Sequence, residues 1–314
     1  MMPAVDVPPG VIPWDDGFEV VTSDGKTLRA ALWEGETDLT ALLLSGRTEF
    51  LEKMAIPATA LVERGFTVIS CDWRGQGLSE RLAEPRIMGH VERFTDYHLD
   101  LKALLAAPQV ARFGEIDLLL AHSMGGAIGL GALYRGLIKP RSVVFSAPML
   151  GFEMSKALRI AGYVTTKIAE FLGKLDKRPP FGAVDKPYVF EGFEGNVLTS
   201  DRAVFDWMVK ALQDEPRLQL AVPSMRWLDQ SMEEMEWFTR QGRLDLPILF
   251  LDGSDEAVVD GAAIDAAVAR LGAEMVTIDG ARHEVLIESE PMRGRAWQAI
   301  DRFLAANGIT AVSD

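Results

Sequence analysis

Short apolar runs alternate with segments of helical spacing along most of this chain. Four such runs fall in its first half: TALLLSG (40–46), FTVISCDW (66–73), IDLLLAH (116–122) and SVVFSAP (142–148). Runs this short and continuous are typical of strands that are covered on both faces. Because segments of helical spacing separate them, the pattern predicts an α/β fold with a mostly parallel central sheet and helices on both faces.

The pattern extends toward both ends of the chain. Residues 18–34 are typical of a hairpin whose turn is supplied by Asp24 and Gly25, and the residues before the hairpin resemble an extended arm. The alternation resumes after residue 244, where we expect a strand over 247–254, a helix over 259–271, a strand over 273–280 and a helix near 291–306.

The stretch from 151 to 244 interrupts this alternation. It contains helical patterns such as RAVFDWMVKAL (202–212) but no buried strand. An all-helical insertion into an α/β core is the simplest explanation of the change. We therefore expect a core formed by residues 1–150 and 245–314, with residues 151–244 forming a helical cap.

The composition excludes some partners. The 314 residues carry a formal net charge of −14 and the sequence pI is near 4.8. This acidity disfavours nucleic acid, whose phosphates select a basic surface, and simple electrostatic docking on anionic lipid. Cys71 is the single cysteine, so an internal disulfide cannot form.

Two further patterns bear on location. The start of the chain is proline-rich and acidic and lacks the features of a secretory signal. No apolar run approaches the roughly 20 residues that a transmembrane helix needs. We expect a soluble, cytoplasmic protein without a transmembrane segment, and the sequence leaves its oligomeric state open.

Three candidate catalytic groups follow strands of the predicted sheet. Ser123 stands in the turn AHSMG after one strand, an acidic turn with Asp255 and Glu256 follows another, and His283 follows a third. Such groups meet at the carboxyl edge of a parallel sheet, and the order serine, acid, histidine is that of the α/β-hydrolase triad. A serine needs a base to become nucleophilic, imidazole serves near neutral pH, and a carboxylate fixes the imidazole tautomer.

The remaining groups of the site follow from their places beside Ser123. The backbone N–H of Met124 comes directly after the nucleophile, and the N–H of Arg47 lies in the loop after TALLLSG. These two donors are expected to form an oxyanion hole. Asp255 and Glu256 both lie in the acidic turn, and the longer arm of Glu256 still reaches an imidazole, so the choice of acid stays open on these grounds.

A metal centre is not expected. Of the four histidines, His283 alone lies at the predicted sheet edge, and the neighbouring side chain of His122 is expected to point away from Ser123. No histidine–carboxylate cluster has metal-ligand spacing, and HEVLIE (283–288) differs from H-E-x-x-H. We therefore expect neither a catalytic metal nor a cofactor.

Several blocks of the sequence resemble one branch of the α/β-hydrolases. SGRTEFLEKM, CDWRGQGLSERL, LLAHSMGGAIG, NVLTSDR and GARHEVLIESEPMR are similar to segments of bacterial lysophospholipases and of monoacylglycerol lipases. The resemblance runs in order from about residue 40 to the C-terminus. It implies a serine ester hydrolase with a helical cap, which acts on lysophospholipids or monoacylglycerols through an acyl-enzyme.

The same resemblance implies roles for individual residues. It places the nucleophile on Ser123, the base on His283 and the oxyanion donors on Arg47 and Met124. The family pattern Gly-x-x-acid ends on Glu256, with Asp255 as the alternative acid. Serine and glycine before Arg47, where many relatives have histidine and glycine, shift the resemblance toward the lysophospholipase branch.

The expected cap is rich in aromatic residues and methionines. Such residues are more often core than ligand contacts, but a cap rests on the mouth of the site. Trp207, Met208, Trp227 and Met232 are therefore candidates for an apolar substrate pocket. Basic residues between 156 and 178 favour transient contact with a phosphate head group or a membrane surface, although a solvated helix face is the simpler interpretation.

Other activities fit the same residues. A thioesterase, an acyltransferase or a short-chain carboxylesterase would use the same triad, and a non-catalytic ligand-binding protein could retain it. The sequence does not distinguish acyl chain length or head group.

Overall fold

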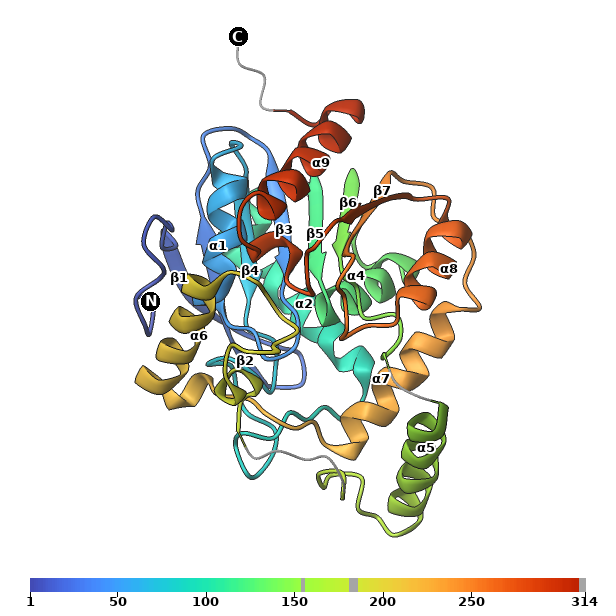
Figure 1. The fold of residues 1–314 in the computed structure, drawn as a ribbon. Helices are drawn as coiled ribbons and strands as arrows, with labels where there is room; N and C mark the ends of the chain where they lie inside the picture. The colour runs from blue at the N-terminus through green and yellow to red at the C-terminus, as the bar shows by residue number, and fades with distance from the viewer. Residues whose placement is uncertain (154–155, 181–185, 311–314) are drawn as a thin grey trace.

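The computed structural model describes residues 1–153, 156–180 and 186–310. An eight-stranded sheet with the order β1-β2-β4-β3-β5-β6-β7-β8 lies at the centre of these residues (Figure 1). The strands are β1 (Asp16–Val21), β2 (Thr27–Trp33), β3 (Thr40–Leu44), β4 (Thr67–Cys71), β5 (Leu118–His122), β6 (Ser142–Ser146), β7 (Ile248–Gly253) and β8 (Glu274–Ile278). β2 pairs antiparallel with β1 and β4, and all other neighbours pair in parallel, which confirms the predicted sheet.

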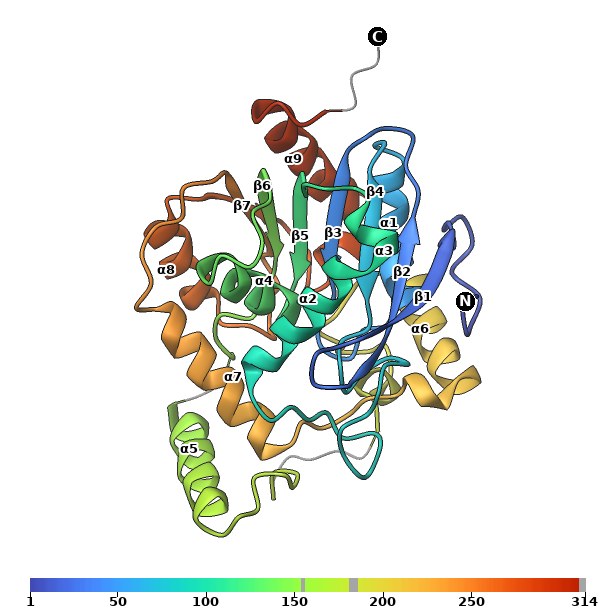
Figure 2. The same ribbon diagram turned by 180° about the vertical axis from the view of Figure 1, so that it is seen from behind.

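Helices cover both faces of the sheet. They are α1 (Leu51–Val62), α2 (Tyr97–Ala106), α3 (Pro108–Ala111), α4 (Met124–Tyr134), α5 (Lys156–Phe171), α6 (Arg202–Asp214), α7 (Met225–Phe238), α8 (Gly261–Leu271) and α9 (Met292–Ala306). In β3, Leu42 and Leu44 pack in the layer of α2, α4 and α8, whereas Ala41 and Leu43 pack in the layer of α1 and α9. Figures 1 and 2 show the two layers from opposite sides. The apolar runs are continuous because both faces are buried.

The predicted turns are confirmed. Gly25 has a φ of 80° and donates its N–H to Thr22 O at 2.9 Å, which closes the hairpin between β1 and β2. Beyond the end of α1, Gly65 has a φ of 85° and donates to Val62 O at 2.8 Å. Glycine suits both positions because it carries no Cβ that would clash in the left-handed region.

The described residues between β6 and β7 form helices and loops, with no β-strand. α7 packs against α4, and α5 packs against α7 at the periphery of the molecule, away from the sheet (Figure 1). α6 covers the start of α1, where Phe205 and Met208 join a cluster with Phe50 and Ile56. This arrangement accords with a helical insertion, and the limits 151–244 for a cap stay a prediction.

Two features outside the layers are used below. The N-terminal residues before β1 form an arm along the outside, where the N–H of Ile12 donates to Thr59 Oγ1 at 2.8 Å and the indole of Trp33 donates to Ile12 O at 3.0 Å. Cys71 ends β4 inside the core, and burial raises the pKa of its thiol well above the ordinary value.

Candidate active site

Ser123 stands on a sharp turn between β5 and α4. Its φ of 51° and ψ of −117° are unusual for a residue other than glycine. The turn requires small neighbours: a Cβ on Gly125 would come within 2.4 Å of Leu44 O, and one on Gly46 within 3.1 Å of Ser123 Cβ. The resulting close approach brings the loop after β3 directly beside the serine hydroxyl.

His283 lies between Ser123 and a carboxylate. Its Nε2 is 3.0 Å from Ser123 Oγ, and its Nδ1 is 2.7 Å from Glu256 Oε2. The other oxygen of Glu256 accepts the N–H groups of Val258 at 2.5 Å and Val259 at 3.1 Å, which fixes the carboxylate. The structure therefore brings together three residues that are far apart in the sequence. Ser123 and Glu256 are separated by 133 positions, and Glu256 and His283 by 27.

Asp255, the alternative acid, lies elsewhere. Its side chain is exposed, and Oδ1 accepts the hydroxyl of Ser254 at 3.1 Å. Among the residues that the structure describes, the carboxylate that contacts His283 is that of Glu256. The geometry thus separates two acids that the sequence leaves side by side.

The electrostatics of the site suit a base that becomes charged. Burial alone would lower the pKa of His283, but the hydrogen bond and charge of Glu256 outweigh it, and the pKa of His283 is raised. Burial likewise opposes ionisation of Glu256, but its contact with His283 lowers the pKa of this carboxyl. The pair therefore stabilises an imidazolium next to Ser123.

The loop after β3 is held by hydrogen bonds on several sides. Trp73 Nε1 donates to Ser45 O at 2.9 Å, Gln76 Nε2 donates to Gly46 O at 2.8 Å, and the N–H of Gly46 donates to Glu49. In a trans peptide the C=O and the next N–H point in opposite directions, so the bond from Gln76 also orients the N–H of Arg47. Among the described residues, neither this N–H nor that of Met124 has a recorded protein acceptor.

A buried ion cluster lies behind His283, and the sequence did not predict it. Lys53 Nζ is 2.9 Å from Glu49 Oε1 and 2.5 Å from Glu284 Oε1. The other oxygen of Glu284 is 3.4 Å from His122 Nε2, and the rings of His122 and His283 lie 4.8 Å apart between centroids. The side chain of His122 therefore packs against the candidate base, and its Nδ1 donates to Ser146 O at 3.0 Å.

Three members of this cluster are of the types that bind metal ions. Donor atoms of Glu49, His122 and Glu284 lie within 4.8 Å of one another, and all three residues are buried. The ammonium of Lys53 contacts both carboxylates, so a cation of the protein already occupies the place between them and offsets part of their charge. Helical spacing does not reveal the cluster, because its four members come from three separate segments. Only Glu49 and Lys53, four residues apart, carry a local signal.

A second missed contact joins the segment before α6 to the histidine loop. Glu288 is fully buried and accepts the N–H and hydroxyl of Ser200, at 2.8 and 2.5 Å, and the N–H of Arg282 at 2.9 Å. The N–H of His283 itself donates to Val197 O at 3.3 Å. The block NVLTSDR thus supports the loop that carries His283.

Two of the four pocket candidates lie beside the loop after β3. The Trp227 ring lies 5.3 Å below the guanidinium of Arg47 and donates its N–H to Tyr97 at 3.0 Å. Met208 borders a cavity of about 30 Å³ together with Phe50 and Lys53.

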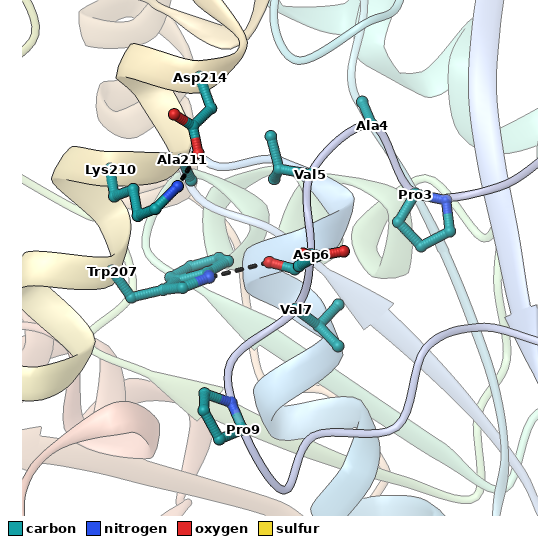
Figure 3. Close-up of a pocket in the computed structure, with 10 residues that line it drawn as sticks. All are labelled: Pro3, Ala4, Val5, Asp6, Val7, Pro9, Trp207, Lys210, Ala211 and Asp214. Carbon is teal, nitrogen blue, oxygen red and sulfur yellow. Dashed lines mark hydrogen bonds and ion pairs between the residues drawn. The ribbon is translucent and has the colours of Figure 1, made fainter.

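The other two candidates line separate hollows. Trp207 donates its indole N–H to Asp6 O at 3.0 Å and lines a cavity of about 600 Å³ between α6 and the N-terminal arm (Figure 3). Met232 borders a cavity of about 350 Å³ with Phe152 and Met235. The described contacts do not bring these two side chains together with Ser123 and His283.

The sheet order, the serine turn and the histidine after β8 together define the α/β-hydrolase class. Residues 35–290 match the family model described as serine aminopeptidase, S33, and the chain belongs to this family. Its similarity to lysophospholipase L2 of Escherichia coli (strain K12) is 31% identity over 281 residues, which cover 85% of this chain and 80% of the relative. The probable lysophospholipase L2 of Haemophilus influenzae is 27% identical over 265 residues, covering 84% and 82%.

A solved structure supports the same class. A soluble variant of monoglyceride lipase from Saccharomyces cerevisiae superposes with a TM-score of 0.72 at 17% identity, covering 98% of this chain and 99% of that one. The fold and the relatives confirm the predicted α/β-hydrolase, a carboxylic ester hydrolase related to lysophospholipases and similar in fold to a monoglyceride lipase.

Proposed function

We propose that this protein cleaves carboxylic esters through an acyl-enzyme on Ser123, with lysophospholipids as its substrates and monoacylglycerols as the alternative. The observation that carries the proposal is the unbroken hydrogen-bond chain from Ser123 Oγ through both ring nitrogens of His283 to Glu256. The names of the two bacterial relatives, lysophospholipase L2 and probable lysophospholipase L2, support the choice of substrate.

The residues act in two half-reactions. Ser123 Oγ attacks the acyl carbon while His283 Nε2 accepts the serine proton, and Glu256 stabilises the resulting imidazolium. The N–H groups of Arg47 and Met124 donate to the oxyanion, and each such donor contributes about 3 kcal/mol in other hydrolases. His283 then gives its proton to the departing glycerol oxygen. Water, deprotonated by the same imidazole, releases the fatty acid and restores the serine.

The proposal is tested first by covalent labelling. A fluorophosphonate probe is expected to label Ser123 in the intact chain, and Ser123→Ala is expected to remove the label. Absence of labelling in the folded wild type would count against any serine hydrolase, and would favour a ligand-binding homologue. Peptide mass spectrometry after digestion identifies the labelled residue.

Substrate choice needs a second experiment. Lysophospholipids, monoacylglycerols, acyl thioesters and p-nitrophenyl esters of matched chain length are compared by kcat/KM. The highest value is expected for a lysophospholipid. A larger value for the thioester or for a short p-nitrophenyl ester would replace the proposed substrate while leaving Ser123 as the nucleophile.

We also propose that the protein works in the cytoplasm and touches membranes transiently through α5. The helices in the described ranges include none with the length and apolar character needed to cross a bilayer. α5 and the residue after it expose Val164, Ile168, Phe171 and Leu172, of which Phe171 is 90% exposed. These positions recur at helical spacing on one side of a peripheral helix (Figure 1).

The basic residues around α5 add to this surface. Lys167 and Lys177 are exposed, each in an ion pair with a neighbouring acidic residue. The side chains of residues 156–160, which include two of the predicted basic residues, lie outside the described part of the chain. The apolar side chains therefore carry the proposal of membrane contact.

A further inference from the structure

The side chain of Arg47 has an unusual environment for a cation. Its guanidinium lies over the Trp227 ring, donates from Nη2 to Ala221 O, and is close enough to Gly89 that a Cβ there would come within 2.9 Å of Nη2. Its Nε is buried without a hydrogen-bond partner among the described residues. No described carboxylate forms an ion pair with it.

Other covered arginines of the chain are satisfied differently. Arg29 and Arg74 each pair with two carboxylates. Arg81, which also lacks a recorded carboxylate partner, donates to five backbone carbonyl oxygens. Arg47 has one carbonyl acceptor and an aromatic face, which leaves most of its donors and its full charge uncompensated by protein groups.

This arrangement carries an energetic cost. Arg47 is half-buried as a whole, but its Nε is fully covered. A cation that is partly removed from water without an anion is disfavoured, and burial lowers the pKa of Arg47 to about 10. An anion that paired with the guanidinium would recover the lost hydration and satisfy the orphaned N–H. A phosphate suits the site because its oxygens accept two N–H groups of one guanidinium at once.

The position of Arg47 indicates that the anion is part of the bound substrate. The backbone N–H of Arg47 is the proposed oxyanion donor. The side chain of Arg47 therefore starts close to the acyl carbon of the bound ester. The number of covalent bonds from this backbone nitrogen to the guanidinium carbon equals the number from the acyl carbon of a 1-acyl lysophospholipid to its phosphorus. One arginine can therefore span both ends of the glycerol unit.

We propose that the Arg47 guanidinium, seated on Trp227, binds the phosphate of the substrate head group and makes the enzyme prefer lysophospholipids to monoacylglycerols. This inference rests on the proposed function, because it places the ester carbon at Ser123. It also explains why an acidic protein keeps an unpaired arginine beside its catalytic serine: the negative partner arrives with the substrate.

The test compares two esters with the same acyl chain, a lysophosphatidylglycerol and a monoacylglycerol, in the wild type, Arg47→Met and Arg47→Lys. The kcat/KM ratio of the phospholipid to the neutral lipid is expected to fall on the order of 30-fold in Arg47→Met, which is the effect of losing charge-assisted hydrogen bonds. Arg47→Lys is expected to restore part of the ratio, because an ammonium keeps the charge but not the planar fork. Arg240→Met, which removes an exposed arginine of the helical segment, is the matched control and should leave the ratio unchanged.

A binding measurement separates this inference from the proposed function. In the Ser123→Ala background, glycerol 3-phosphate is titrated by calorimetry, and its affinity is expected to fall at least tenfold when Arg47→Met is added. An equal loss of activity on both lipids in Arg47→Met, or unchanged affinity for glycerol 3-phosphate, overturns the inference and makes Arg47 a support of the loop after β3. If the wild type hydrolyses neither lipid, the proposed function fails, and the titration still decides whether Arg47 binds phosphate.

Discussion

The carboxyl edge of the sheet and the helical segment between β6 and β7 hold their charges in opposite ways. At the sheet edge several charges are buried and paired, as in Lys53 between Glu49 and Glu284. The helical segment carries exposed ion pairs, namely Arg202 with Asp206, Lys210 with Asp214 and Arg240 with Glu236, although Glu234 of α7 is buried and pairs with Arg135 of the core. Breaking a buried pair is costly, whereas exposed pairs contribute little. The difference teaches that a lost charge should be costly in the buried pairs of the sheet edge and tolerated in the exposed pairs of the helical segment.

The largest effect is expected at the sheet edge from Ser123→Ala. Removal of the proposed nucleophile should lower kcat about 10⁶-fold, the effect of removing a serine nucleophile in another hydrolase. The melting temperature should stay within about 2 °C, because the change removes one hydrogen bond and leaves the pair of His283 and Glu256 in place. Steady-state hydrolysis of a p-nitrophenyl ester and a thermal melt check both parts. Residual activity near wild type would assign the chemistry to another residue.

The two neighbouring acids should differ by orders of magnitude. Glu256→Gln keeps the shape but removes the negative charge. The N–H groups of Val258 and Val259 hold the remaining carbonyl oxygen, so the amide NH2 faces His283 Nδ1 and kcat should fall about 10⁴-fold. Asp255→Asn changes an exposed side chain and should alter kcat by less than about threefold. Parallel kinetics of the two variants at pH 8 measure the contrast. The assignment of Glu256 is wrong if the aspartate change is the damaging one.

The pH profile offers a smaller and independent effect. Only the neutral imidazole of His283 accepts the serine proton, so kcat/KM should rise with pH and level off above the histidine pKa. Because Glu256 raises that pKa against the opposing effect of burial, the midpoint should lie above 6.5, the ordinary value. Below the midpoint activity should fall about tenfold per pH unit. A midpoint below 6.5 would contradict the contact between His283 and Glu256.

The contact of Glu288 with Ser200 tests the contrast between the buried charges of the sheet edge and the exposed charges of the helical segment. It joins Ser200 of the helical segment to Glu288 of the His283 loop, and it is buried like the groups of the sheet edge. Glu288→Gln puts an amide NH2 against donors such as Ser200 and Arg282 and should lower the free energy of unfolding by about 2 kcal/mol, with a few-fold loss of kcat through the His283 loop. Glu236→Gln, in an exposed pair, should cost less than about 0.5 kcal/mol. Urea unfolding compares the two, and equal effects would remove the distinction between the regions.

The smallest effect is expected on α5. Phe171→Ser combined with Ile168→Ser removes exposed apolar area and should weaken binding to zwitterionic phosphatidylcholine vesicles several-fold, as measured by sedimentation. Turnover of a water-soluble short-chain ester should not change. Val21→Ser, which removes an exposed apolar side chain from β1, is the control. Undiminished vesicle binding by the α5 variant would assign membrane contact to another surface or to none.

The sequence predicted the sheet, the turns and the convergence of Ser123 and His283, because these follow from local period and from the rule that parallel strands end at one edge. It did not predict the charges around them. Lys53, His122 and Glu284 meet through tertiary packing, and nothing in their sequence spacing indicates that one lysine would pair with two buried carboxylates.

The candidate pocket residues also show what the sequence could not predict, which is the surroundings of each side chain. The four candidates are all tryptophans or methionines of predicted helices: Trp207, Met208, Trp227 and Met232. Even so, Trp227 lies under Arg47, whereas Trp207 lies against the N-terminal arm. Amphipathic helices indicate which face is covered, but not what covers it. The sequence likewise did not predict that Arg47 would lack a carboxylate partner among the described residues, because an arginine in a loop is usually solvated or paired.

Cys71 has a practical consequence. As the single thiol of the chain, buried in β4 and held protonated, it should resist maleimides and methanethiosulfonates. A cysteine introduced at Phe171 would then be the one readily modified thiol, with the native residue left in place. A spin label or fluorophore attached there would report how far α5 travels when an inhibitor occupies the serine.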